Sequence, residues 1–389
     1  MPATATPAAE RHLLTVEGLG RLLRTLREDG YTLVGPTVQD GAIVHAEIAG
    51  IEDLPAGWTA VQEAGSYRLQ RRDDGALFGY AVGQHSWKQR LFVPRLCLLE
   101  VRKESGSFTV ETEQAPPPRL ALIGARSCDL HAIGVQDRTF LHGAFVDPDY
   151  AARRQQVFVV AVCCGQAGGT CFCASMGTGP RATSGFDLSL TELAGGAGRR
   201  FVVDVGSERG RELLRRTQSQ GEGLASLASP EDGRQADETV SAAARSMGRA
   251  LDTSGIKELL YRNQEHPRWD DVASRCLACT NCTLVCPTCF CGSVEDTSDL
   301  AGETAERWRR WDSCFTLAHS YLHGGSVRAS IRSRYRQWLT HKVASWIDQF
   351  GTSGCVGCGR CITWCPAGID ITREVAAIRA TDGQGGTEP

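Results

Sequence analysis

Two cysteine runs near the C-terminus share the spacing C-x2-C-x2-C-x3-C, and a proline follows each of them. The spacing is the bacterial ferredoxin signature for two [4Fe-4S] clusters, because three cysteines of a run face one cluster while the fourth reaches its neighbour. The sequence therefore predicts electron-transfer chemistry with crossed ligands. One cluster would be held by Cys276, Cys279, Cys282 and Cys365, and the other by Cys355, Cys358, Cys361 and Cys286.

Structural zinc is the alternative interpretation of these runs, since zinc sites also use C-x2-C pairs. A structural zinc ion takes four ligands. It does not require two runs of four cysteines, each with a proline behind it. The pattern therefore favours iron–sulfur clusters over zinc.

A second group of cysteines lies in the N-terminal half, after two segments that are expected to be strands. Neighbouring parallel strands end at the same edge of a sheet, so these thiols can converge there. Two interpretations remain open, namely a third [4Fe-4S] cluster and a set of buried, inert thiols. The group consists of Cys128, Cys164, Cys171 and Cys173.

The remaining cysteines give weaker signals. Cys97 stands alone, and we expect it to pack in the interior. Cys289, Cys291 and Cys314 lack a fourth cysteine, so the sequence assigns them no role.

Composition excludes several classes of protein. The net charge of −3 argues against a nucleic-acid partner, and the longest apolar run, residues 157–164, is too short to span a membrane. Residues 1–10 contain no basic and apolar pattern typical of a secretory signal. The 17 cysteines are grouped at metal-ligand spacings, which is typical of a reducing compartment. We therefore expect a cytoplasmic protein without direct membrane insertion.

Hydrophobic periodicity predicts the elements that position these cysteines. Leucines at helical spacing predict a helix over residues 19–26. Apolar runs between Gly, Pro and Asp predict strands, and the last two of them are nearly continuous, as in a buried sheet. The predicted strands are residues 31–34, 42–48, 120–123 and 156–162.

The expected fold class is α+β, with a mixed α/β domain followed by a helical, ferredoxin-like domain for two clusters. The two cysteine runs are 68 residues apart, which is far more than a compact ferredoxin needs. The predicted divisions are a disordered tail (1–10), the α/β domain (11–217), a surface linker (218–240), the dicluster domain (241–380) with an Arg-rich insertion (292–350), and a mobile tail (381–389).

The insertion carries a basic stretch between residues 307 and 342. It contains eight positively charged side chains and one aspartate, which gives a net charge of +7. One interpretation is a solvated helical face. The other is a source of positive charge beside the clusters, which would raise their potential and offset their burial. The charged residues are Arg307, Arg309, Arg310, Arg328, Arg332, Arg334, Arg336, Lys342 and Asp312.

Motifs around the cysteines resemble a known family. The chain is similar to the dicluster [4Fe-4S] electron-transfer (β) subunit of sulfhydrogenase-type cytoplasmic [NiFe] hydrogenases and to the iron–sulfur subunit of anaerobic sulfite reductase that belongs to the same family. In that family pattern Cys164 is the matching cysteine, and Cys163 falls where other members usually carry a different residue. The resemblance rests on residues 286–291, 310–314, 355–361 and 368–371, and in the N-terminal half on 128–133 and 171–180.

The resemblance implies an electron relay that is not catalytic alone. Such subunits carry electrons between a flavin-containing, NAD(P)H-reactive subunit and a catalytic partner, which is either the small and large subunits of a [NiFe] hydrogenase or a sirohaem sulfite reductase. We favour the hydrogenase branch, because the Arg-rich insertion and the second cysteine run look closest to it. The alternative is a self-contained iron–sulfur oxidoreductase that binds its own flavin or substrate. No G-x-G-x-x-G motif follows a predicted strand, which agrees with a relay.

Overall fold

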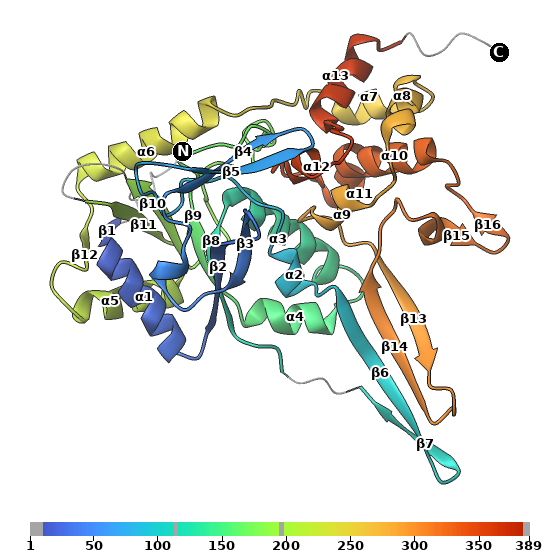
Figure 1. Cartoon of the computed structure of the whole chain (residues 1–389), viewed down its shortest axis with the longest axis horizontal. Helices are drawn as coiled ribbons and strands as arrows, with labels where there is room; N and C mark the ends of the chain where they lie inside the picture. The colour runs from blue at the N-terminus through green and yellow to red at the C-terminus, as the bar shows by residue number, and fades with distance from the viewer. Residues whose placement is uncertain (1–10, 113–115, 194–197, 384–389) are drawn as a thin grey trace, which may run out of the picture.

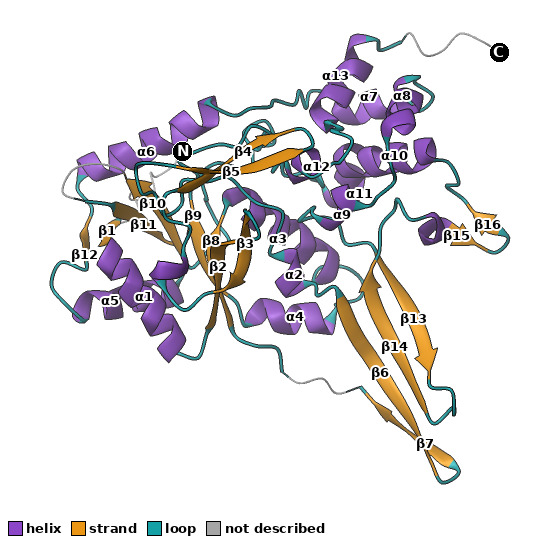
Figure 2. Ribbon diagram, in the orientation of Figure 1, coloured by secondary structure: helices purple, strands orange, loops and turns teal. Residues whose placement is uncertain are grey.

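The computed structural model describes residues 11–112, 116–193 and 198–383. Figure 1 shows an N-terminal α/β body, a helical C-terminal part and a β-sheet arm that projects from them, and Figure 2 separates the helices from the strands. The α+β fold class predicted from the sequence is confirmed. The predicted tail at residues 1–10 lies outside the described residues.

The N-terminal body is built on an eight-stranded sheet in the order β12-β1-β11-β10-β9-β8-β2-β3. Its centre is parallel, since β10 pairs with β9, β9 with β8, and β8 with β2 in that orientation. The strands are β1 (His12–Thr15), β2 (Thr32–Gln39), β3 (Ala42–Glu47), β8 (Leu120–Ala125), β9 (Phe158–Val162), β10 (Leu188–Leu193), β11 (Arg200–Val205) and β12 (Ala225–Leu227).

Helices cover both faces of this sheet because its strands are apolar on both sides. On one face, α1 and α5 bury leucines such as Leu22 and Leu213 against Ile123 and Val160. On the other, α3 and α4 bury Ile133 and Tyr150 against alternate strand residues. The helix expected around residues 19–26 and all four expected strands are therefore confirmed. The helices are α1 (Val16–Glu28), α2 (Lys88–Leu91), α3 (Ser127–Phe140), α4 (Pro148–Gln155), α5 (Glu208–Ser219) and α6 (Pro230–Arg245).

Residues 218–240 carry regular structure where their composition predicts a surface linker. Strand β12 extends the large sheet by pairing with β1. Ser229 and Asp232 form a reciprocal capping box that begins α6. The Ser-Pro-Glu-Asp sequence, whose composition is typical of a turn, therefore forms the N-terminus of a helix.

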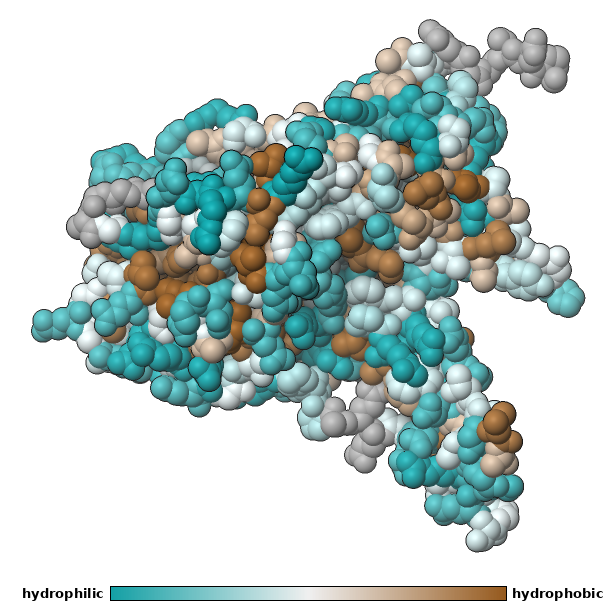
Figure 3. Space-filling view, viewed as in Figure 1, coloured by the Kyte–Doolittle hydropathy of each residue, from teal (hydrophilic) through white to brown (hydrophobic). Residues whose placement is uncertain are grey.

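The arm joins segments that are about 200 residues apart in the sequence. Strand β14 (Thr304–Trp311) pairs on one side with β13 (Gly292–Ser298) and on the other with β6 (Arg95–Glu104), which also pairs with β7 (Ser107–Glu111). The first arginines of the basic stretch therefore lie in a strand, and a helical face exists only in α10 (Ile331–Thr340). The visible surface of the arm is mainly hydrophilic (Figure 3).

The C-terminal part packs its helices around large apolar side chains, among them Leu260, Trp269 and Trp338. Residues 381–383, expected in a mobile tail, make contacts in this part, because Asp382 pairs with Arg262. Residues 384–389 lie outside the described part of the chain. The helices are α7 (Ile256–Arg262), α8 (Arg268–Arg275), α9 (Asn281–Leu284), α11 (Trp346–Phe350), α12 (Arg360–Thr363) and α13 (Ile371–Ala380).

A short hairpin of β4 (Trp58–Glu63) and β5 (Ser66–Arg71) connects the two halves. The amide of Gly65, at its turn, donates a hydrogen bond of 3.0 Å to the carbonyl of Ile362 in α12. The ring of Tyr67 stacks on Trp364 with centroids 5.1 Å apart. In the described ranges, no helix has the length and apolar character that a membrane span requires.

Candidate metal centres

The two cysteine runs adopt the same local conformation. Ala278 and Thr280 in the first run have positive φ angles of 49° and 69°, and Gly357 and Gly359, at the same places in the second run, have 63° and 75°. The left-handed region is unusual for residues other than glycine, so the first run holds it against a steric cost. In each run a single helical turn, α9 or α12, then carries the third cysteine.

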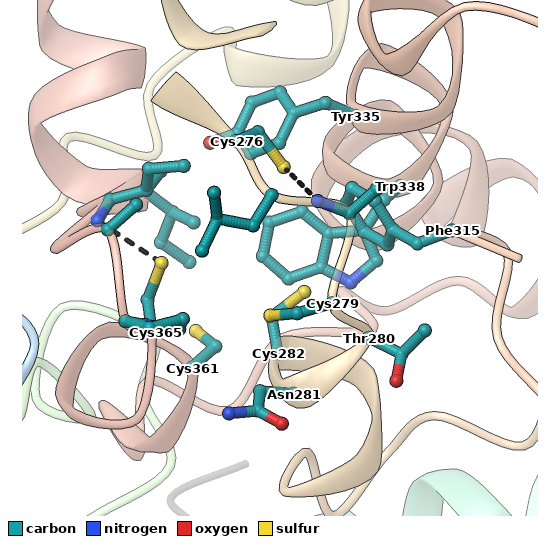
Figure 4. Close-up of a pocket in the computed structure, with 16 residues that line it drawn as sticks. Cys276, Cys279, Thr280, Asn281, Cys282, Phe315, Tyr335, Trp338, Cys361 and Cys365 are labelled. Atoms are coloured by element: carbon teal, nitrogen blue, oxygen red, sulfur yellow. Dashed lines mark hydrogen bonds between the residues drawn. The ribbon is translucent and has the colours of Figure 1, made fainter. Parts of the chain in front are cut away.

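The thiols of the first run surround a pocket together with a cysteine of the second run. Cys276, Cys279 and Cys282 line one side of this pocket, and Cys365 and Cys361 line the other. Figure 4 shows these sulfur atoms facing the same space, with a wall formed by Phe315, Tyr335 and Trp338. Cys365, 83 residues beyond Cys282, is therefore beside the first run, as crossed ligation requires.

Backbone amides point at several of these sulfur atoms. The amide of Ala278 donates to the Sγ of Cys276 and that of Ile369 to the Sγ of Cys365, both at 3.4 Å (Figure 4). In the second run, the amide of Gly357 donates to the Sγ of Cys355 at 3.5 Å. Such donors stabilise negative charge on sulfur and influence the potential of a cluster.

The second run has the matching partner from the first. The thiol of Cys286 lies within electrostatic reach of Cys355, Cys358 and Cys361. Burial and then the neighbouring thiols raise the pKa of Cys355 to about 12 and that of Cys361 well above its usual range. Three of these cysteines are buried and Cys361 is half-buried. Four thiolates at such a place need positive charge, which iron supplies, so the donor set fits a [4Fe-4S] cluster.

Lys342 adds a buried positive charge at this group. It lies in a π-helical turn at His341–Ser345, and its Nζ donates to the Oγ1 of Thr288 at 2.9 Å. Thr288 in turn lies 3.1 Å from the Sγ of Cys286. Although burial disfavours its charge, the thiolates of Cys286, Cys289 and Cys355 raise the pKa of Lys342 well above its usual range.

The rest of the basic stretch is divided between two environments. On the arm, Arg307 pairs with Asp296 at 2.7 Å and Arg310 with Glu295 at 3.2 Å, and both pairs are exposed to solvent. Arg334, by contrast, is buried and contributes positive charge beside Cys276. The stretch is therefore partly a solvated surface and partly a source of positive charge near the cysteines.

The N-terminal cysteines also converge. Cys164 and Cys171 both act electrostatically on Cys173, and Cys173 acts on Cys128. Burial, and then Cys164 and Cys358, raise the pKa of Cys171 to about 12. Cys163 points elsewhere: its Sγ lies 3.5 Å from the Oγ of Ser189 and accepts from the amide of Ala182. The structure thus groups Cys164, rather than Cys163, with the other three.

The loop that carries Cys171 and Cys173 is in backbone contact with the second run. The amide of Phe172 donates to the carbonyl of Gly357 at 2.8 Å. A Cβ atom at Gly357 would lie 2.7 Å from the Cα of Cys173, and one at Gly359 would overlap the carbonyl oxygen of Thr170. Cys128, Cys173 and Cys358 accordingly pack in one buried cluster.

A buried ion pair crosses the same contact. The Nη2 of Arg360, in the second run, lies 2.9 Å from the Oδ1 of Asp129, next to Cys128, and both side chains are almost fully buried. The Nε of Arg360 also donates to the carbonyl of Gly83 at 3.0 Å. Breaking such a pair by removing one partner typically costs about 3–5 kcal/mol, so the pair fixes the two groups of thiols relative to each other.

Comparison with known proteins agrees with this geometry. A family profile described as a 4Fe-4S dicluster domain matches residues 275–369, the segment that contains both runs. Over 284 residues, the chain is 34% identical to sulfhydrogenase 2 subunit beta of Pyrococcus furiosus, with 72% of this chain and 81% of that relative covered. The chain belongs to the sulfhydrogenase β-subunit family. The resemblance inferred from the motifs is confirmed, and so are the two [4Fe-4S] clusters of the dicluster domain.

Besides the three groups and Cys163, which has already been placed, four cysteines remain. The thiol of Cys97, on the arm, donates to the carbonyl of Leu99 at 3.4 Å. Cys289, Cys291 and Cys314, to which the sequence assigned no role, are neighbours: Cys289 lies beside Cys286 and near Cys291, and Cys291 lies beside Cys314. Their proximity would have followed from recognising residues 292–298 and 304–311 as a β-hairpin, because the pairing of these two strands brings Cys291 close to Cys314.

The loop contact predicts unequal effects of two glycine substitutions. Gly357→Ala and Gly351→Ala both place a side chain at a positive φ, of 63° and 69°, but only the first meets other atoms within 4 Å. We expect Gly351→Ala to lower the free energy of unfolding by about 1–2 kcal/mol. Gly357→Ala should lower it by about 2–5 kcal/mol, since overpacking adds about 1–3 kcal/mol.

Anaerobic urea unfolding at matched iron content measures both effects. Equal losses in the two variants would show that the contact between the loops contributes nothing beyond backbone strain.

Proposed function

We propose that this protein carries electrons between an NAD(P)H-oxidising flavin subunit and the small subunit of a [NiFe] hydrogenase. The observation that supports it most strongly is the exchange of fourth cysteines, with Cys365 beside the first run and Cys286 beside the second. The proposed ligands of cluster one are Cys276, Cys279, Cys282 and Cys365. Those of cluster two are Cys286, Cys355, Cys358 and Cys361.

A third [4Fe-4S] cluster on Cys128, Cys164, Cys171 and Cys173 would extend this relay. Three of these cysteines (Cys128, Cys171 and Cys173) are buried, and Cys128 and Cys173 pack with Cys358 of cluster two in one buried cluster. Cys361 of cluster two in turn lies within reach of Cys282 of cluster one. The proposed electron path therefore runs from the N-terminal group through cluster two to cluster one.

Cluster one has the surface that a redox partner needs. Cys279 is exposed, and Leu277 beside it is 67% exposed, whereas the thiols of cluster two and of the N-terminal group are mostly buried. Leu284, at the other end of the first run, is 38% exposed, so exposed apolar side chains flank Cys279 on both sides in the sequence. We infer that one partner docks at residues 277–284.

The identity of the partner rests on the relative. Sulfhydrogenase 2 subunit beta is by its name one subunit of a larger hydrogenase assembly. We infer the same kind of assembly for this chain, with hydrogenase small and large subunits on one side and a flavin subunit on the other.

Iron content tests the three sites separately. The dicluster domain accounts for about eight iron atoms per chain, and the N-terminal group for about four more. We expect Cys128→Ser and Cys171→Ser each to remove about four irons and to leave the dicluster domain loaded, while Cys163→Ser, on the adjacent residue, removes none. If Cys128→Ser and Cys171→Ser both kept the full iron content, the N-terminal thiols would be structural and would not bind a cluster.

The crossed ligands predict which cluster each cysteine affects. Because a serine oxygen is a poorer iron ligand than a thiolate, Cys365→Ser should disturb cluster one and Cys358→Ser should disturb cluster two. Electron paramagnetic resonance of the reduced proteins separates the two signals. If both substitutions altered the same signal, the runs would not cross.

The same Cys365→Ser variant tests the relay in the assembled complex. We expect hydrogen-dependent NAD(P)⁺ reduction to fall at least about tenfold, while dye-linked activity of the flavin subunit and of the hydrogenase subunits is retained. Unchanged hydrogen-dependent NAD(P)⁺ reduction would contradict the proposed function.

Lys342 predicts a change in potential. Reduction adds a negative charge to cluster two, and the buried ammonium stabilises it. In general, two unit charges roughly 6–8 Å apart at an effective dielectric constant of about 20 interact by about 2–3 kcal/mol, which is roughly 90–130 mV for one electron. Lys342→Gln should therefore lower the midpoint potential of cluster two by up to about that amount in a redox titration. Lys257→Gln, on an exposed ion pair with Asp348, should leave it unchanged.

A further inference from the structure

A short hairpin at residues 317–327 exposes large apolar side chains. It consists of a 3₁₀ turn (Leu317–Ser320), β15 (Tyr321–Leu322) and β16 (Gly325–Ser326). Figure 1 shows it projecting outward from the helical C-terminal part. Several exposed apolar side chains on one projecting element are typical of an interaction site rather than of scattered surface residues. Those between 53% and 65% exposed are Leu317, Tyr321, Leu322 and Val327.

The hairpin exposes apolar side chains on both of its faces. Consecutive residues of a strand point to opposite sides, so Tyr321 and Leu322 stand on opposite faces of β15. They are 62% and 65% exposed. A hairpin that packed one face against its own body would bury one of these two side chains. The arrangement therefore fits an element that enters a depression in another protein.

Polar contacts within the hairpin hold it in one conformation. The Oγ of Ser326 donates to the carbonyl of Leu317 at 2.8 Å and lies 2.9 Å from the Oγ of Ser320. The amide of Val327 donates to the carbonyl of Ser320 at 3.0 Å. An element that is already ordered loses less conformational entropy when it binds. The apolar side chains are therefore presented on a preorganised support.

The charge around the hairpin defines the chemistry of its partner. From residue 313 to residue 347 the sequence contains no Asp or Glu. Arg328, at the end of the hairpin, forms no ion pair within the described part of the chain. Apolar side chains beside an unpaired positive charge complement a surface that is apolar at its centre and carries carboxylates around it.

The root of the hairpin is attached to the first cysteine run. The Oγ1 of Thr283, in α9, donates to the Oγ of Ser313 at 2.8 Å, and this bond is buried. Phe315, two residues before the hairpin, lines the pocket of the first run (Figure 4). Its carbonyl accepts from the Nη1 of Arg334 at 3.0 Å. A partner that holds the hairpin is therefore held beside cluster one and the exposed residues 277–284.

We propose that residues 317–327 form a docking hairpin that inserts into an apolar pocket, rimmed by carboxylates, on the subunit that exchanges electrons with cluster one. The inference rests on the proposed function, in which cluster one ends the electron path toward the hydrogenase small subunit. A symmetric contact between two copies of this chain would bring two positively charged hairpins together, which is unfavourable.

Binding of the full-length, cluster-loaded chain to the hydrogenase subunits tests the hairpin. Tyrosine and large apolar side chains at the centre of an interface carry much of its affinity, so Tyr321→Ser and Leu322→Ser should each raise the dissociation constant at least about tenfold. Anaerobic isothermal titration calorimetry measures it. Phe108→Ser removes a side chain that is 68% exposed on the arm and should leave the dissociation constant unchanged. Wild-type binding by both hairpin variants, or an equal loss in Phe108→Ser, would overturn the inference.

A charge substitution tests the rim of the partner's pocket. Arg328→Gln should raise the dissociation constant about two- to tenfold at low ionic strength and make binding less dependent on salt. Arg211→Gln, in an exposed ion pair with Glu208 on α5, should change neither quantity. Unchanged affinity and salt dependence in Arg328→Gln would contradict a pocket rimmed by carboxylates.

Two further measurements identify the occupant. Electron paramagnetic resonance of Tyr321→Ser and Leu322→Ser should match that of the unaltered chain, because surface substitutions leave the clusters in place. Loss of affinity for the flavin subunit alone, or a change only in self-association during sedimentation, would assign the hairpin to another partner and overturn the inference.

The outcomes for the hairpin and for the relay are distinguishable. If Cys365→Ser slows hydrogen-dependent NAD(P)⁺ reduction while Tyr321→Ser and Leu322→Ser bind the hydrogenase subunits normally, the docking hairpin is refuted and the relay stands. If Cys365→Ser leaves that reduction unchanged, the relay is refuted whatever the hairpin variants do.

Discussion

The backbone contact between the loop at residues 170–173 and the second cysteine run determines how the halves of this protein are joined. Phe172 and Gly357 share a hydrogen bond, and Gly357 and Gly359 approach the opposing backbone more closely than any Cβ would allow. The first run carries Ala278 and Thr280 at the corresponding positive φ angles, and there Leu277 and Cys279 are exposed. Two loops of one design thus differ in glycine content because one is pressed against the α/β body and the other faces solvent.

Compensation of buried charge is the second requirement, and each group of thiols meets it with its own cation. Arg360 and Asp129 form a buried pair between the N-terminal group and cluster two. Arg126 lies against Cys164, Lys342 lies against Cys286, and Arg334 lies near Cys276. The ligands of each cluster in the dicluster domain come from elements far apart in the sequence, so a complete site exists only in the folded chain. Folding and cluster insertion should therefore be coupled in this chain.

Local sequence was sufficient to predict the features that depend on short spacing. The spacing within each run, the continuous apolar strands at 120–123 and 156–162, and the helix around residues 19–26 all follow from patterns a few residues long. The convergence of Cys128 and Cys164 followed from one further rule, that parallel strands end at a common edge. Pairings over long separations could not be predicted this way, because the match of Leu99 to Arg307 depends on tertiary packing, and so does the orientation that separates Cys163 from Cys164. The capping box at Ser229 was missed for a different reason, because its residue types are those of a turn.

The long insertion between the two cysteine runs contributes side chains to both of them. A compact ferredoxin closes its clusters with the two runs and little else, whereas here the 68 intervening residues supply the far wall of cluster one through Phe315, Tyr335 and Trp338. The same insertion delivers Lys342 to cluster two and Cys314 to the base of the arm. The insertion therefore walls the thiols of the first run and places a positive charge beside those of the second. Because β14 is also held by β6 from the N-terminal half, these tasks depend on a strand pairing between both halves. The proposed electron path therefore depends on the completed fold and not on the dicluster segment alone.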